Sequence, residues 1–123
     1  MKNETKVCVS GYFNPLHIGH IRHFRDAKKL GTLIVIVNND KQIELAGSKP
    51  LMSEMERLEI VKSIRYVDDA MLSIDDDDTV CRTLEMISPN VFAKGGNKTK
   101  DTIPERKLCD KLDIKIVSYV GGD

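Results

Sequence analysis

The sequence predicts an α/β fold in which five parallel strands form one doubly wound sheet within a single domain. Strand-like and helix-like stretches alternate along the whole chain, and residues 32–37 form an unbroken apolar, mostly β-branched run typical of strands buried on both faces. A chain of 123 residues suffices for one hydrophobic core and not for two. We therefore expect right-handed crossovers and a ligand site outside the carboxyl ends of the strands, at the topological switch point.

The predicted strands and helices follow from local patterns in the sequence. We predict strands at residues 6–10, 32–37, 69–74, 91–94 and 114–118, and helices at residues 18–30, 53–65, 79–87 and 103–112. The first strand alternates in polarity, and the first helix carries apolar residues at helical spacing from Ile18 to Leu30. Gly31 ends that helix. Residues 38–50 are mostly polar and contain glycine and proline, so we expect a loop there.

The helices of the second half begin at recognisable caps. Ser53 is expected to cap the second helix, with Glu56 at the capping-box position. Asp78 and Thr79 are expected to cap the next helix, which stops before Pro89. We interpret the acidic run 75–78 as a solvated loop and helix cap rather than a metal site, because no spaced ligand pattern accompanies it.

Composition and charge exclude several classes of protein. Lys plus Arg and Asp plus Glu both number 19, so the basic excess typical of nucleic-acid binders is absent. No apolar run approaches the roughly 20 residues of a membrane-spanning helix, and the N-terminal residues lack a signal-peptide core. Cys8, Cys81 and Cys109 are odd in number and far apart, which indicates reduced, buried thiols. We expect a cytoplasmic domain with neither a nucleic-acid nor a membrane partner.

All three histidines fall within residues 11–23, where the first strand turns into the first helix. His17 and His20 are three residues apart and therefore share one helical face. That face lies beside a helix N-terminus, whose free N–H groups and positive dipole end attract anions. The window is thus interpreted as a site for a phosphorylated ligand. His23 lies one turn further on and is expected to be a surface or packing residue.

The window Gly11-Tyr-Phe-Asn-Pro-Leu-His17-Ile-Gly-His20 resembles the H-x-G-H motif of the nucleotidyltransferase superfamily, usually G-x-F-D-x-x-H-x-G-H. Within it the chain is similar to small cytidylyltransferases and adenylyltransferases, including the glycerol-3-phosphate cytidylyltransferases and the heptose-phosphate adenylyltransferases. The resemblance covers nearly the whole chain, with counterparts for Glu56-Arg57, Arg65-Tyr-Val-Asp68 and Lys94-Gly-Gly-Asn97. It implies a Rossmann-like fold.

The resemblance implies an enzyme that transfers a nucleotidyl group from a nucleoside triphosphate to a phosphorylated alcohol or sugar and releases pyrophosphate. Such catalysis consists mainly of positioning and of preorganised donors for the developing negative charge. CMP transfer is favoured, because chain length and residues 65–68 match the glycerol-phosphate type; adenylyl transfer is the alternative, because residues 94–97 match the heptose-phosphate type. Mg²⁺, bound mainly through the nucleotide phosphates, and a homodimer are also implied.

The resemblance also implies roles for individual residues. The catalytic residues would be His17, His20 and Lys49. The nucleotide-binding residues would be Tyr12, Phe13, Asn14, Gly19, Lys94, Gly95 and Gly96. Asp68 and Arg57 would bind the acceptor, and no protein ligand to a metal is expected. The loops after the first, second and fourth strands are expected to form one crevice that contains these groups.

Three departures from the pattern leave a second class of function open. Asn14 stands where the family has aspartate, and Ala46-Gly47 stands where a lysine often precedes the glycine, so Lys49 is the candidate in its place. The sequence ends at Asp123, where relatives continue into a Ser/Thr-rich segment. We expect either a truncated C-terminus or a site that closes differently. The second class is a nucleotide-binding or regulatory module without turnover.

Overall fold

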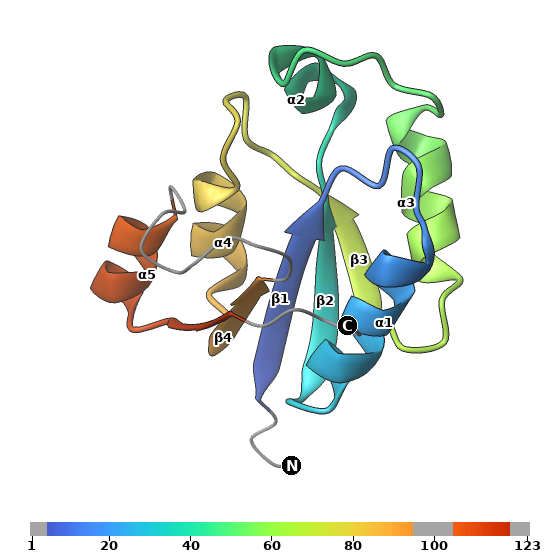
Figure 1. The fold of residues 1–123 in the computed structure, drawn as a ribbon. Coiled ribbons are helices and arrows are strands. Elements are labelled where there is room, and N and C mark those ends of the chain that lie inside the picture. Colours follow the sequence, from blue (N-terminus) through green and yellow to red (C-terminus); the bar gives the residue numbers. More distant parts are fainter. Residues whose placement is uncertain (1–4, 95–104, 119–123) are drawn as a thin grey trace.

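The computed structural model describes residues 5–94 and 105–118 and has one sheet between two layers of helices (Figure 1). All five strands are parallel, in the order β3–β2–β1–β4–β5. The strands are β1 (Lys6–Gly11), β2 (Thr32–Val37), β3 (Asp69–Leu72), β4 (Val91–Lys94) and β5 (Lys115–Ser118). The helices are α1 (Ile18–Lys28), α2 (Asp40–Leu45), α3 (Glu54–Lys62), α4 (Cys81–Ile87) and α5 (Arg106–Leu112). The predicted doubly wound sheet is confirmed.

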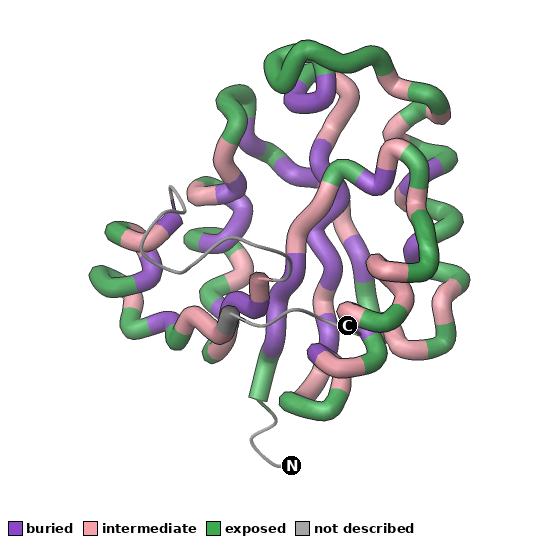
Figure 2. Tube along the Cα trace, in the orientation of Figure 1, coloured by how far each residue is buried: buried purple, intermediate pink, exposed green. Residues whose placement is uncertain are grey.

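The two core clusters explain why the central strands are apolar on both faces. Successive residues of a strand point to opposite faces. Val7 and Val9 of β1 therefore pack in the cluster under α1 and α3, whereas Cys8 packs in the cluster under α4 and α5. The same alternation runs along residues 32–37 of β2, with odd positions in the first cluster and Ile36 in the second. Figure 2 shows the buried central strands between the more exposed helices.

The capping box predicted for the second helix is confirmed in α3. The hydroxyl of Ser53 accepts a hydrogen bond from the N–H of Glu56 at 3.2 Å, and the Glu56 carboxylate accepts one from the N–H of Ser53 at 3.2 Å. The helix ends at Lys62, three residues before the predicted end. Ser63 is the C-cap, and its hydroxyl donates to the carbonyl of Glu59 at 2.9 Å. A side chain that bonds the preceding turn helps to end the helix there.

The cap predicted for α4 was right in kind and wrong in residue. The carboxylate of Asp75 accepts hydrogen bonds from the N–H groups of Arg82 at 2.8 Å and Thr83 at 3.0 Å, so it caps the first turn. Asp75 is only 2% exposed, which corrects the interpretation of 75–78 as a wholly solvated run. Asp78 and Thr79 precede the helix, which begins at Cys81. A carboxylate at a helix N-terminus also gains from the dipole.

Residues 38–50, predicted to be a loop, contain the short helix α2. The carbonyl oxygen of the Asn39 side chain accepts from the N–H of Gln42 at 2.9 Å, and the side chain of Gln42 accepts from the N–H of Asn39 at 3.1 Å. This is a reciprocal capping box. Six residues are too few for helical periodicity to be visible, but the spacing of Asn39 and Gln42 is the signal that could have revealed the helix.

Two expectations from composition concern thiols and membrane spans. All three cysteines are free, with Cys8 and Cys109 buried and Cys81 half-buried. Burial raises the pKa of Cys8 to about 12 and that of Cys109 to about 11, so these two thiols stay protonated. Across residues 5–94 and 105–118, no helix is long and apolar enough to cross a membrane.

Candidate active site

The histidine window lies at the switch point of the sheet. The chain proceeds outward from β1 through β2 to β3, then crosses back to place β4 on the other side of β1. The carboxyl ends of β1 and β4 are therefore adjacent and their following segments diverge, which is where open α/β sheets bind ligands. Residues 12–17 lead from the end of β1 to the first turn of α1 at this point (Figure 1).

His17 is the N-cap of α1 and folds back over the helix. Its Nδ1 accepts a hydrogen bond from the N–H of Gly19 at 3.0 Å. A Cβ atom at position 19 would lie 2.8 Å from Cε1 of the His17 ring, so only glycine leaves room for this ring position. The glycine of the H-x-G-H window therefore has a structural reason in this chain, besides the close approach of a ligand that the resemblance implies for it.

His20 completes the reciprocal cap. Its Nδ1 accepts a hydrogen bond from the N–H of His17 at 3.0 Å, and the two ring centroids lie 4.0 Å apart. Because Nδ1 is an acceptor in both rings, the neutral form of each ring carries its proton on Nε2. The pair thus presents two Nε2–H donors side by side, on the far sides of the rings from the backbone.

This cap changes how the helix end could bind an anion. The N–H of Gly19 is used by the His17 ring, and the N–H groups of His20 and Ile21 both donate to the carbonyl of His17, at 3.0 and 3.3 Å. Three of the backbone donors expected to meet the ligand are therefore used within the turn. The imidazole Nε2–H groups of His17 and His20 are then the donors available to an anion at the positive end of the helix.

Burial, followed by the neighbouring charges of His17 and His23, lowers the pKa of His20 to about 4. The ring is therefore neutral at pH 7. Phe13 packs against the His20 ring: the two rings meet edge to face with centroids 5.0 Å apart, and Phe13 is 2% exposed. Phe13 thus belongs to the core, which leaves its main chain for the nucleotide-binding role assigned to it. Gly11 is required beneath it, because a Cβ there would lie 2.7 Å from the Phe13 ring.

Arg57 is a buried clamp. Its guanidinium donates to the carbonyls of Tyr12 at 2.8 Å, Asn38 at 2.6 Å and Met52 at 3.2 Å. It also forms an ion pair with Asp40 at 2.6 Å, and its side chain is 0% exposed. The guanidinium is buried and fully occupied by these partners, so acceptor binding by Arg57 stays a prediction that the structure does not support directly. Its role here is to join the segments that follow β1 and β2 to the start of α3.

Asp68 lies at the other end of the sheet. Its carboxylate accepts from the Lys28 ammonium and, at 2.8 Å, from the N–H of Leu33 at the start of β2. Although partial burial opposes it, the hydrogen bond from Lys28 lowers the pKa of Asp68. α1 spans the gap between His17 and Lys28, and at about 1.5 Å per residue this is about 16 Å. The structure therefore does not bring Asp68 to the histidines, and its predicted contact with the acceptor stays a prediction.

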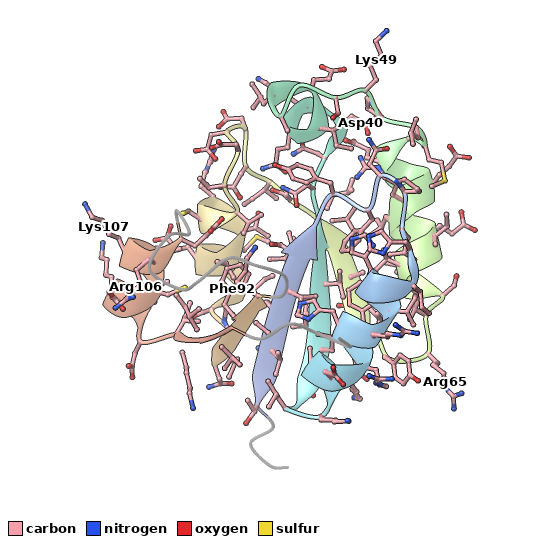
Figure 3. The ribbon with its side chains drawn as sticks, in the orientation of Figure 1. Asp40, Lys49, Arg65, Phe92, Arg106 and Lys107 are labelled. Carbon is pink, nitrogen blue, oxygen red and sulfur yellow. The ribbon has the colours of Figure 1, made fainter. Side chains whose placement is uncertain are left out.

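Lys49 and Asn14 come from two loops that meet above the sheet. Lys49 is exposed, and its ammonium points outward into solvent (Figure 3). The structure therefore does not bring this ammonium to the histidines. The side-chain amide of Asn14 binds the backbone on both sides of Pro50: its Nδ2 donates to the carbonyl of Lys49 at 2.9 Å, and its Oδ1 accepts from the N–H of Leu51 at 2.7 Å.

The remaining assigned residues lie on the β4 side. Lys94 ends β4, with its ammonium 5.3 Å from the centroid of the Phe92 ring. Burial and then the charge of Lys94 lower the pKa of the half-buried His23, which places this lysine near α1. Tyr12 is exposed; burial, followed by Asp78 and Glu105, raises the pKa of its phenol. Gly95 and Gly96 lie outside the described residues, and the crevice expected between the three loops stays a prediction.

A buried amide network near the site was missed from the sequence. Gln42 is 0% exposed, and its Nε2 donates to the carbonyls of Asp77 at 2.8 Å and Thr79 at 2.7 Å. Its Oε1 accepts from Nδ2 of Asn38 at 3.0 Å. Asn39 adds two further bonds from its amide to the carbonyls that follow β3, at 3.1 and 3.0 Å. These side chains hold the end of β2 against the β3–α4 loop.

The chemistry of the donor set suits phosphate oxygens. His17 and His20 offer N–H donors, since their Nδ1 lone pairs are already used. In the part of the chain that the structure describes, no group of three or more His, Cys, Asp or Glu side chains is placed to hold a metal ion. A parallel sheet with such donors at its switch point defines an α/β protein whose candidate site is chemically suited to a phosphorylated ligand.

Comparison with known proteins gives the family. The cytidylyltransferase-like family model matches residues 8–119, and the chain belongs to this family. The chain is 31% identical over 126 residues to the bifunctional protein HldE of Syntrophotalea carbinolica, covering 98% of this chain and 25% of HldE. It is 35% identical over 113 residues to the FAD synthase of Aciduliprofundum boonei, covering 91% of this chain and 74% of that protein. The chain thus spans about a quarter of the length of its HldE relatives.

A solved structure confirms the fold. The crystal structure of the lipopolysaccharide core biosynthesis protein from Thermoplasma volcanium superposes with a TM-score of 0.83 at 28% sequence identity. The match covers 98% of this chain and 100% of that chain. The sheet and its helices are therefore those of a cytidylyltransferase-like domain, as the resemblance implied.

Proposed function

We propose that this protein transfers a nucleotidyl group from a nucleoside triphosphate to a phosphorylated alcohol or sugar and releases pyrophosphate. The observation that carries the proposal is the pair of Nε2–H donors that His17 and His20 present at the start of α1. Membership of the cytidylyltransferase-like family supports the same class of reaction.

The proposed reaction is an in-line displacement. An oxygen of the acceptor phosphate forms a bond to the α-phosphorus while the bond from that phosphorus to the bridging oxygen of pyrophosphate breaks. The acceptor phosphate is largely a dianion at pH 7, so no base is required to deprotonate it. Because the lowered pKa keeps His20 neutral, its part is to donate a hydrogen bond to oxygens that gain charge in the transition state.

We propose ATP as the donor, with CTP as the alternative. The expectation of CMP transfer rested partly on residues 65–68, and Asp68 of this run accepts from the N–H of Leu33 at the amino end of β2. Arg65 projects at the same end of the molecule (Figure 3). FAD contains an adenylyl group, and relatives named FAD synthase match over 74% of their own length. Mg²⁺ would accompany the nucleotide phosphates, since the histidines present donors rather than lone pairs.

The experiment is a panel of ATP and CTP against phosphorylated acceptors, in Mg²⁺, scored by pyrophosphate release. We expect turnover with at least one pair, and a loss of roughly 10²-fold in kcat for His17→Ala and His20→Ala, because each removes a donor to the transition state. Lys107→Ala is the matched control, since this lysine projects from α5 on the far side of the molecule (Figure 3). An unchanged rate in folded His20→Ala would contradict the proposal.

The panel also separates the second class of function. A module without turnover would bind ATP or CTP in calorimetric titration and release no pyrophosphate with any acceptor. A tenfold difference between the two nucleotides is about 1.4 kcal/mol and would settle the donor. The homodimer implied by the resemblance stays a prediction, and light scattering at several protein concentrations tests it.

A further inference from the structure

Asn14 stands where the family pattern has aspartate, and its contacts in this chain require an amide. One end of its side chain donates, from Nδ2 to the carbonyl of Lys49 at 2.9 Å. The other end accepts, at Oδ1 from the N–H of Leu51 at 2.7 Å. A carboxylate has acceptors only, so it could keep the bond from Leu51 but would set an anionic oxygen against the Lys49 carbonyl.

A second clamp joins the same two loops. Arg57 donates to the carbonyl of Tyr12 in the β1–α1 loop and to that of Met52 in the loop before α3. Each of the two loops that Asn14 joins is therefore also bonded to the buried Arg57 guanidinium, at Tyr12 in one loop and at Met52 in the other. The side chain of Lys49 is exposed between these anchors and points into solvent (Figure 3).

We propose that Asn14 is a positioning residue that acts through Lys49. Its amide holds the Lys49 backbone beside the histidine turn, so that the ammonium can reach the nucleotide phosphates by rotation of its side chain alone. Less conformational entropy is then lost when the lysine engages the ligand. This inference rests on the proposed function for the role of Lys49, but the two hydrogen bonds of Asn14 to the loop at residues 49–51 do not depend on it.

The effect of Asn14→Asp distinguishes a positioning role for Asn14 from the mere loss of the aspartate that the family pattern has at this position. Restoring the family residue by Asn14→Asp should weaken the site rather than improve it. At low pH the introduced carboxyl group can be protonated, and it then has one donor and one acceptor, like the amide. Because only the protonated form matches both partners, its pKa should lie above the usual value for aspartate of about 3.9.

The test is a double-mutant cycle of Asn14→Asp with Lys49→Ala, read by pyrophosphate release and by titration with ATP and Mg²⁺. We expect Asn14→Asp to lower kcat about tenfold when Lys49 is present and less than about twofold in the Lys49→Ala background. Equal effects in both backgrounds, or a rate that rises on Asn14→Asp, would overturn the proposal.

A readout without nucleotide separates the clamp from the activity. In Asn14→Ala the N–H of Leu51 loses its acceptor, so its hydrogen exchange should accelerate at least about tenfold while core amides of β1 and β2 keep their rates. Unchanged exchange at Leu51 refutes the clamp whatever the activity. Faster exchange in a protein that releases no pyrophosphate supports the clamp and counts against the proposed function instead.

Discussion

The two ends of the sheet use charged side chains in different ways. At the carboxyl ends, Arg57 is fully buried and its cation bonds three backbone carbonyls and Asp40. At the amino ends, the ion pair of Lys28 and Asp68 is about two-fifths exposed on both sides, at 40% and 38%. An exposed pair contributes only about 0–1 kcal/mol, whereas a buried cation is costly to leave without its partners. The carboxyl end is thus organised to hold loops in place, and the amino end mainly closes the fold.

The largest expected effect comes from Arg57→Met, which keeps much of the side-chain volume and removes the cation. Asp40 and three carbonyls lose their donor, so we expect about 3–5 kcal/mol less stability in urea unfolding. A loss below about 1 kcal/mol would show that the buried clamp is no stronger than the exposed pair.

The amide network should give the next largest effect. In Gln42→Leu the amide of Asn38 and the carbonyls of Asp77 and Thr79 lose a buried partner. We expect about 2–3 kcal/mol of destabilisation in urea unfolding, because each buried polar group left unpaired is costly. Gln42→Glu is the matched variant: it keeps the acceptor and loses the donors, so a loss as small as in a surface substitution would contradict the network.

Acid should lower the free energy of unfolding of the chain through the protonation of His20. The folded pKa of His20, about 4, lies below the ordinary value of 6.5, so the unfolded chain binds more protons between these values. The contribution of neutral His20 to the free energy of unfolding is therefore complete above pH 6.5 and is lost as the pH falls toward 4. Since the ring is partly solvated, we expect no more than about 2 kcal/mol.

The measurement for His20 is the difference between the natural chain and His20→Gln in urea unfolding from pH 7 to pH 4. Carboxylates titrate in both chains, so their contribution cancels in the difference. The natural chain should lose more stability than the variant across this range. Parallel stability curves would mean that the ring is not held in its neutral form.

The smallest effect is expected for Asp68→Asn, which keeps an acceptor for the N–H of Leu33 and loses the charge that pairs with Lys28. We expect at most about 1 kcal/mol of destabilisation and no change in kcat. A tenfold fall in kcat, with stability preserved, would mean that the two ends of the sheet are not separate in function.

The sequence predicted correctly those features of the fold that depend on neighbouring residues. The alternation of strands and helices, the period of two along residues 32–37 and the capping box at Ser53 each have a physical cause within a few residues, and the structure confirms them. The histidine window was recognisable from the spacing of its residues, whereas the reciprocal cap between His17 and His20 was not predicted. Even α2 had a local signal, although a short one.

Contacts with distant backbone could not be predicted in this way. Arg57 bonds the carbonyls of residues 12, 38 and 52, and a carbonyl is the same in every residue, so its partner leaves no pattern in the sequence. The cap by Asp75 was assigned to Asp78 because four adjacent aspartates offer equal local signals, and only burial distinguishes them. The place of Asp68 needed the length of α1 and the pairing of the strands, which only the fold provides.

The clamp by Arg57 also bears on the order in which the chain can assemble. The H-x-G-H window is complete by residue 20, but the turn that presents it is anchored by a side chain 45 residues downstream of Tyr12. A fragment that ends after β2 would contain every histidine and lack this anchor. We therefore expect a nascent chain or a peptide graft of the window to remain unable to hold a nucleotide until α3 has docked, so that competence arrives late and all at once.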